Sequence, residues 1–244
     1  MDFLASPSPI ESGQSAAPRY IYDGRLRRGA KRRAAVLARA VEIASTQGLE
    51  GVTIGRLAAD LGISKGHLSE LFPSKQTLQI AALDAAVARF AEQVVARGER
   101  ARSPLRRLRR LCDAWFRYVA RRVFPGGCFL YATANEYRAR PGPIRDRVRQ
   151  HRAAWDRQLA GAIREGQRVG RIHKSVDAAD LVVELTSYQA GANLAALLGD
   201  REAFRRAERA TRERISRACR FPTRDSARYF VRLGRRGVAS HAAK

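Results

Sequence analysis

Four neighbouring residues offer the chemistry of base reading if they lie on one helix. With 100° between successive residues, Gly66 and Glu70 share one face, and His67 and Ser69 flank it. A glycine on that face lets the backbone approach a groove closely, while imidazole, hydroxyl and carboxylate groups can bond to base edges. The pattern predicts a helix that reads DNA through its outward face.

Two serines mark helix starts on either side of that face. Ser64 and Ser74 are both good N-caps, and the free backbone N–H groups at a helix start suit a phosphate. Lys75 comes directly after the second cap. We therefore expect Lys75 to contact the DNA backbone.

These residues belong to a longer pattern, Thr53–Lys75, in which two short helices meet at a glycine. Apolar side chains recur where the two helices would pack together: Leu57, Leu61, Ile63, Leu68 and Leu71. Ala58 permits close approach, and Gly62 can adopt the positive φ of a tight turn. The pattern predicts a helix-turn-helix whose second helix, roughly residues 65–72, enters the major groove. A structural αα-hairpin is the alternative, but a basic run at residues 25–33 favours DNA binding.

Residues 33–78 resemble the DNA-binding domain of TetR-like transcriptional regulators. The positions that match its pattern are Gly48, Thr53, Leu57–Ala58, Gly62–Ile63–Ser64, Gly66, Leu68, Phe72, Ser74–Lys75 and Leu78. The resemblance implies a dimeric, all-helical repressor that a small ligand releases from palindromic operator DNA. Ser69 stands where the family usually has Tyr, and Leu71 where it often has His or Tyr, and both family residues commonly contact DNA. The candidate DNA-binding residues are Thr53, Ser64, Lys65, Gly66, His67, Ser69, Glu70 and Lys75.

The composition supports this interpretation without deciding it. A net charge of +24 in 244 residues attracts nucleic acid or anionic membrane surfaces. The charge is spread over the whole chain, however, and all but five of the 47 basic residues are Arg, which a GC-rich genome would also produce. A nonspecific architectural DNA-binding protein is the alternative that the charge alone suggests.

The cysteines, the N-terminus and the apolar runs indicate the compartment and the cofactors. Its three cysteines, Cys112, Cys128 and Cys219, are scattered, which argues against a disulfide framework and fits a reducing cytosol. The N-terminus does not read as a signal peptide, and no apolar run approaches the ~20 residues of a membrane span. We expect a cytoplasmic protein with no metal and no cofactor.

The chain divides into four segments. We expect a disordered extension at residues 1–24, the basic arm and helix-turn-helix at 25–76, a helical body at 77–218, and a basic tail at 219–244. The first helix is expected from about Lys31 to Thr46, and about nine helices in all. The predicted fold is all-α, with an N-terminal three-helix DNA-binding domain and a C-terminal helical domain for ligand binding and dimerisation.

The arm and the tail each have two interpretations. The arm, RLRRGAKRR, can reach phosphates or an adjacent minor groove, or can be a solvated charge run. The tail has an arginine at every fourth position from Arg220 to Arg236, a cationic stripe if helical. Like charges at that spacing disfavour an isolated helix, so we expect a disordered tail.

Ligand binding is expected in the body, around the segment CFLYATANEY at residues 128–137. It mixes apolar and polar groups between Pro/Gly breaks, as a pocket requires. The candidate ligand-binding residues are Trp115, Phe116, Cys128, Tyr131, Asn135 and Trp155. Core packing is the competing interpretation of these aromatic side chains. We expect a neutral or anionic, partly aromatic or aliphatic ligand, because a positive guest is disfavoured by the cationic body unless Glu136 lies inside.

Dimerisation is expected through the last two helices. A strip of small and apolar residues would let helices pack closely: Ala190, Gly191, Leu194, Ala195 and Leu198. Burial of the strip inside the monomer is the alternative. Catalysis is poorly supported, because the four histidines are isolated and no HExxH, GxSxG or phosphate-cradling glycine loop occurs. An enzyme with its site in the body is the least favoured function.

Overall fold

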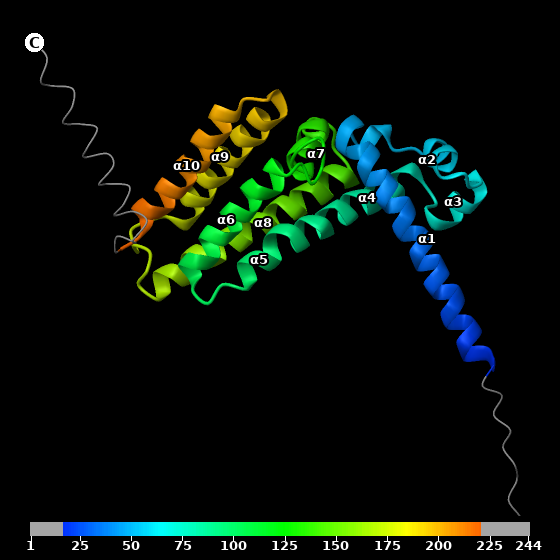
Figure 1. Cartoon of the computed structure of the whole chain (residues 1–244), viewed down its shortest axis with the longest axis horizontal. Coiled ribbons are helices and arrows are strands. Elements are labelled where there is room, and N and C mark those ends of the chain that lie inside the picture. The colour runs from blue at the N-terminus through cyan, green and yellow to red at the C-terminus, as the bar shows by residue number, and fades with distance from the viewer. Residues whose placement is uncertain (1–16, 221–244) are drawn as a thin grey trace, which may run out of the picture.

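The computed structural model describes residues 17–220, which form an elongated, all-helical molecule (Figure 1). The helices at the N-terminal end are α1 (Ala17–Gln47), η1 (Leu49–Gly51), α2 (Ile54–Leu61), α3 (Lys65–Leu71) and α4 (Lys75–Phe90). Those that follow are η2 (Ala91–Val95), α5 (Ala96–Glu99), α6 (Pro104–Ala120), α7 (Phe129–Tyr137), α8 (Pro143–Arg168), α9 (Ala178–Leu198) and α10 (Arg201–Ala218). The all-α prediction is confirmed, and the count in the described part is ten α-helices rather than about nine.

Helices α1, α2 and α3 form one end of the molecule, which we call the head, and α5–α10 form the other, the body (Figure 1). Helix α4 packs on α1 at its start and on α7 and α8 further along. A π-helical stretch, η2, joins α4 to α5, so helix runs without a break from Lys75 to Glu99. The head is therefore attached to the body by continuous helix.

The turn between α2 and α3 has the geometry that its glycine predicts. Gly62 adopts φ 63°, ψ 33°, the left-handed region in which an L side chain is strained. Leu57 of α2 and Leu68 of α3 are fully buried, and Ala58 of α2 is buried as well. The helix-turn-helix is thus a packed unit, as predicted.

Helix α1 is longer than the sequence pattern indicated. It begins at Ala17 rather than near Lys31, so residues 17–24, which we expected to be disordered, are helical. The stretch has no proline after Pro18, and proline is tolerated in the first turn of a helix. A helix that projects beyond the head, as this part of α1 does, needs no apolar stripe (Figure 1). The predictions for residues 1–16 and 221–244 lie outside the described residues.

The body has one continuous core. Its largest fully buried side chains include Trp115, Phe116, Leu108, Leu159 and Ile163, from α6 and α8. The side chains of Ser103, Asp177 and Asp200 cap the starts of α6, α9 and α10. Helix α10 packs chiefly on α9, and the two lie side by side at the end of the molecule away from the head (Figure 1). Within residues 17–220, no helix is both long and apolar enough to cross a membrane.

Candidate DNA-binding site

Helix α3 is short, and its first turn is fixed by its cap. The Ser64 hydroxyl oxygen accepts a hydrogen bond from the backbone N–H of His67 at 3.1 Å. Thr53 caps α2 in the same way, accepting from the N–H of Arg56 at 3.2 Å. Both side chains therefore serve the helix starts, and Thr53 is half-buried while Ser64 is exposed.

The outward face of α3 is the one expected. Lys65, Gly66, Ser69 and Glu70 are exposed, whereas Leu68 on the opposite side is completely buried. The helix can therefore present this exposed row to a groove while its apolar side holds it against the head.

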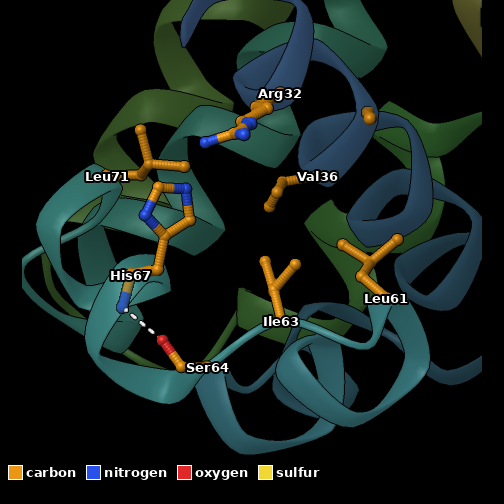
Figure 2. Close-up of a pocket in the computed structure, with 8 residues that line it drawn as sticks. Arg32, Val36, Leu61, Ile63, Ser64, His67 and Leu71 are labelled. Atoms are coloured by element: carbon orange, nitrogen blue, oxygen red, sulfur yellow. Dashed lines mark hydrogen bonds between the residues drawn. The ribbon is translucent and has the colours of Figure 1, made fainter.

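His67 lies differently from the other candidates. Its ring is half-buried and points across a cleft toward Arg32 of α1 (Figure 2). Its Nδ1 atom lies 3.5 Å from a carboxylate oxygen of Glu70. His67 thus occupies the flank of α3 that faces α1, and its Nε2 atom is enclosed without a hydrogen-bond partner in the described residues.

The head is braced by contacts from α1. The Arg33 guanidinium lies 4.5 Å over the ring of Phe72 and donates to the carbonyl oxygen of Leu71 at 3.1 Å. Arg39 binds the Asp60 carboxylate through two nitrogens at 3.0 and 2.8 Å. Both nitrogens donate to the same carboxylate oxygen, and charge-assisted hydrogen bonds of this kind are stronger than neutral ones. Helices α2 and α3 are therefore held at a defined angle to α1.

Leu71 is one of the two departures from the TetR-like pattern. Its side chain is half-buried, packs against the apolar core, and lines the cleft between α1 and α3 (Figure 2). Ser69, the other departure, is exposed. The contacts that an aromatic side chain would make at these two positions are absent from this head.

Lys75 stands at the start of α4, which Ser74 caps with a full capping box through Thr77. Its ammonium nitrogen lies 2.7 Å from a carboxylate oxygen of Glu50. Hydrogen bonds from Lys75 and then from Tyr137 lower the pKa of Glu50 below its ordinary value. Lys75 remains exposed, so a phosphate can reach it in competition with Glu50.

Glu136 joins the body to the head, a role that the sequence did not reveal. From the last turn of α7, its carboxylate accepts hydrogen bonds from the backbone N–H groups of Leu49 and Glu50, both at 2.9 Å. The close approach depends on Gly48, at φ 76°, since a Cβ there would lie 2.7 Å from a Glu136 oxygen. Tyr137 adds a hydrogen bond to Glu50 at 2.6 Å. The segments are far apart in sequence, so no local pattern pairs them.

The other end of α7 is tied to two further helices. The backbone N–H of Gly126 donates to the Ser45 hydroxyl of α1 at 3.0 Å, and that of Cys128 donates to Asn193 of α9 at 2.7 Å. A Cβ at Gly126 would collide with the carbonyl oxygen of Ser45 at 1.7 Å. Helix α7 therefore contacts the head through its last turn, and the loop that leads into it contacts both α1 and α9.

Most of the candidate ligand residues are packed in the core of the body. Trp115, Phe116, Cys128 and Trp155 are buried, and Tyr131 is half-buried. The ring of Trp115 meets Phe116 and Tyr131 edge to face, at centroid distances of 5.2 and 6.1 Å. Trp155 packs on Phe90 instead, at 5.2 Å. Asn135 is exposed, and its assignment to a pocket stays a prediction.

One buried polar group lies beside these aromatic rings. Gln189 of α9 is completely buried, and its carbonyl oxygen accepts from the Trp155 indole N–H at 3.1 Å. Its amide nitrogen has no hydrogen-bond partner in the described residues. A buried donor without a partner costs free energy, so the site favours an acceptor that could reach it.

The expected dimer strip lies mainly on the outer face of α9. Leu194 and Leu198 are 58% and 76% exposed, and Ala190 and Gly191 are also exposed, whereas Ala195 is buried inside the monomer. Two further side chains on this helix, which we had not assigned, are exposed as well: Val183 and Leu197, at 62% and 45%. Together they leave a row of large apolar side chains uncovered in the single chain.

Comparisons with known proteins give two matches along the sequence. A family model described as "Bacterial regulatory proteins, tetR family" matches residues 36–82. A second, "Tetracyclin repressor-like, C-terminal domain", matches residues 104–211. No curated protein matches the chain.

Solved structures share the fold over most of their length. A TetR transcriptional regulator from Chloroflexus aurantiacus J-10-FL is 25% identical, with a TM-score of 0.73, over 79% of this chain and 98% of that one. A transcriptional regulator from Saccharomonospora viridis, in complex with choline, is 23% identical, with a TM-score of 0.66, over 78% and 98%. AibR, in complex with isovaleryl coenzyme A and operator DNA, is 21% identical, with a TM-score of 0.55, over 67% and 86%.

Proposed function

The chain belongs to the TetR family of bacterial DNA-binding transcriptional regulators. On that premise we propose that it is a dimeric repressor that binds a palindromic operator. A small molecule then releases it from the DNA. The observation that carries the DNA-binding part is the outward face of α3. Its exposed row, from Lys65 to Glu70, stands on a capped helix braced by α1. A rigid, polar, uncovered helix of this kind suits the major groove.

Dimerisation is supported by the uncovered apolar row on α9. A two-fold operator needs two heads about one turn of DNA apart, ~34–36 Å between half-site centres. Large apolar side chains in a continuous exposed row mark an interaction surface. In this proposal the exposed apolar side chains of α9 pack against the same set in a second copy: Val183, Leu194, Leu197 and Leu198.

A ligand site in the body is supported by Gln189 and the aromatic rings beside it. The Saccharomonospora viridis regulator binds choline and AibR binds isovaleryl coenzyme A, so the fold accommodates small molecules of different chemistry. In this chain Glu136 binds the head rather than the body interior, so no carboxylate of α7 is left to favour a cation. We propose a neutral or anionic ligand whose acceptor group pairs with the Gln189 amide.

Release requires that the ligand change the position of the heads. A ligand can do so only through its different affinity for the two arrangements. Helix α7 connects the core to the head through Glu136 and through the Gly126–Ser45 contact. In this proposal a ligand beside Tyr131 shifts α7, and the shift moves α1 and η1.

Two other functions fit the structure less well. A nonspecific architectural DNA-binding protein would not need the defined outward face of α3, and members of this family are transcription factors rather than enzymes. Acting on chromosomal DNA would place the protein in the cytoplasm.

The test is selection of DNA from a random-sequence pool by the full-length protein. We expect an enriched site with two inverted half-sites. A second selection with Ser69→Ala should change the preferred bases within each half-site and leave their spacing unaltered. Enrichment of a single, asymmetric half-site would contradict the dimeric arrangement. If no sequence were enriched, the proposal of a sequence-specific regulator would fail.

A further inference from the structure

A cleft of about 510 Å³ lies in the head itself, between α1 and the recognition helix α3. Its volume is within the ~300–1,000 Å³ range of small-molecule sites. Figure 2 shows side chains from α1 on one side, from the α2–α3 turn below, and from α3 on the other side, all turned toward one open space. The cleft is separate from the core of the body, where we place the proposed inducer.

The interior of the cleft is apolar. Val36, Leu61, Ile63 and Leu71 supply aliphatic side chains from three helices and the turn. Three of them, all except Val36, are only partly buried, so their remaining apolar surface is accessible to water. Covering such surface is favourable in proportion to its area. The cleft therefore favours a guest with a hydrocarbon or aromatic part.

The polar groups of the cleft are basic or neutral. Arg32 and His67 face each other across it (Figure 2), and none of the residues that line it is acidic. The Arg32 guanidinium forms no hydrogen bond or ion pair in the part of the chain that the structure describes. The His67 Nε2 atom is enclosed and also lacks a partner there. Ser64 uses its hydroxyl oxygen to cap α3. The two unpartnered nitrogen groups mark a place for an anion.

We propose that this cleft binds an anionic amphiphile, a molecule with a carboxylate or similar head group and a short aliphatic or aromatic tail. The head group pairs with the Arg32 guanidinium and accepts from His67 Nε2, while the tail covers Ile63, Leu61 and Leu71. Charge-assisted hydrogen bonds of this kind are the stronger ones in proteins. The guest lies against the flank of α3.

Because the guest neutralises a cation beside α3 that would otherwise attract the phosphate backbone, it competes with DNA. This part of the inference rests on the proposed DNA-binding function. It differs from release through the body, since no movement of α7 is required. The head thus carries its own inhibitory site.

The experiment uses octanoate as the probe, with acetate and octan-1-ol as matched compounds that lack the tail or the charge. Binding to the full-length protein is measured by calorimetry, and displacement of the selected DNA by fluorescence anisotropy. Burying methylene groups adds affinity with each group, so octanoate should bind at least 100-fold more tightly than acetate. It should also bind at least tenfold more tightly than octan-1-ol, and the Ile63 methyl resonance should shift on titration.

Ala35→Trp fills the cleft from its α1 side, where Ala35 is exposed. Ala38→Trp is the matched control, since Ala38 is exposed on the same helix and does not line the cleft. We expect Ala35→Trp to weaken octanoate binding at least tenfold, to keep DNA affinity within about threefold, and to resist displacement. The control should behave as the parent does.

Equal octanoate binding by the two variants would overturn the inference, because the probe would then be held elsewhere, for instance in the body. Simultaneous binding of octanoate and DNA would overturn the competition. If the parent protein selects no DNA sequence, the proposed function fails, and the calorimetry with the two variants still decides whether the cleft is a binding site.

Discussion

Replacing Glu136 by Gln should loosen the head from the body without disturbing either. The carboxylate accepts from two backbone N–H groups, of Leu49 and Glu50, both at 2.9 Å. A glutamine can accept from one of them, but its NH₂ group would face the other donor. Gly48 keeps the two segments in contact, so the side chain has little room to turn away.

The magnitude follows from the type of bond. Hydrogen bonds to a charged group contribute about 1.5–3 kcal/mol each when they are shielded from water. Only one of the two is partly buried here, so we expect a loss of roughly 1–2 kcal/mol for the substitution. Since ~1.4 kcal/mol corresponds to a factor of ten, local opening of residues 48–52 should become about tenfold more frequent.

Amide hydrogen exchange measures that opening directly. The peptide covering residues 48–52 should exchange about tenfold faster in Glu136→Gln, while peptides from α8 and α9 should be unchanged. Glu92→Gln is the matched control, because Glu92 is exposed and forms no side-chain hydrogen bond or ion pair within the described residues. Unchanged exchange at residues 48–52 in Glu136→Gln would refute the role assigned to the carboxylate.

Four other changes test separate parts of the account. Lys75→Ala should weaken binding to all DNA sequences alike and lower the slope of log affinity against log salt by about one charge, as titrations at several salt concentrations will show. Glu70→Ala should relax selection at one base pair if the carboxylate accepts from a cytosine; a rise in affinity with unchanged preference would contradict that contact. Leu194→Asp should give monomers with much weaker operator binding in sedimentation and anisotropy measurements, whereas Val169→Asp, at an exposed apolar position outside α9, should stay dimeric. Because its partners lower the pKa of Glu50, the stability that this group contributes is complete above its ordinary pKa of about 4.5 and is lost as the pH falls through the lowered value. Between pH 5 and pH 3 the melting temperature should therefore fall further in the parent than in Glu50→Gln, and parallel curves would exclude the contribution.

The head was predictable because its signals are local. Helix caps such as Ser64, a turn glycine at Gly62 and an apolar row along α2 and α3 lie within about twenty residues, where spacing translates directly into geometry. His67 shows the limit of that reasoning. Its position on the helix was predicted, but its turn toward Arg32 depends on α1, which meets α3 only in the folded head (Figure 2).

The contacts between head and body could not be derived in this way. Glu136 belongs to a segment whose mixture of apolar and polar residues resembles the wall of a pocket when α7 is considered alone. Only the folded chain places its carboxylate at the backbone N–H of Leu49. The start of α1 was misplaced for a different reason. Amphipathic periodicity signals burial, and a helix that projects beyond its domain, as residues 17–30 do, lacks that signal.

The central claim is that α3 reads a specific DNA sequence. The most direct test is the ratio of affinities for the selected site and for a shuffled sequence of the same length and composition, measured by anisotropy at one physiological salt concentration. A sequence-specific regulator typically binds its site ~10³-fold or more tightly than other DNA. We expect a ratio of at least that size for the parent. Gly66→Glu should reduce it at least tenfold, because it puts a carboxylate on the face that meets the groove. A ratio near one for the parent would contradict sequence reading by α3, and would leave the +24 charge as the sole basis for DNA binding.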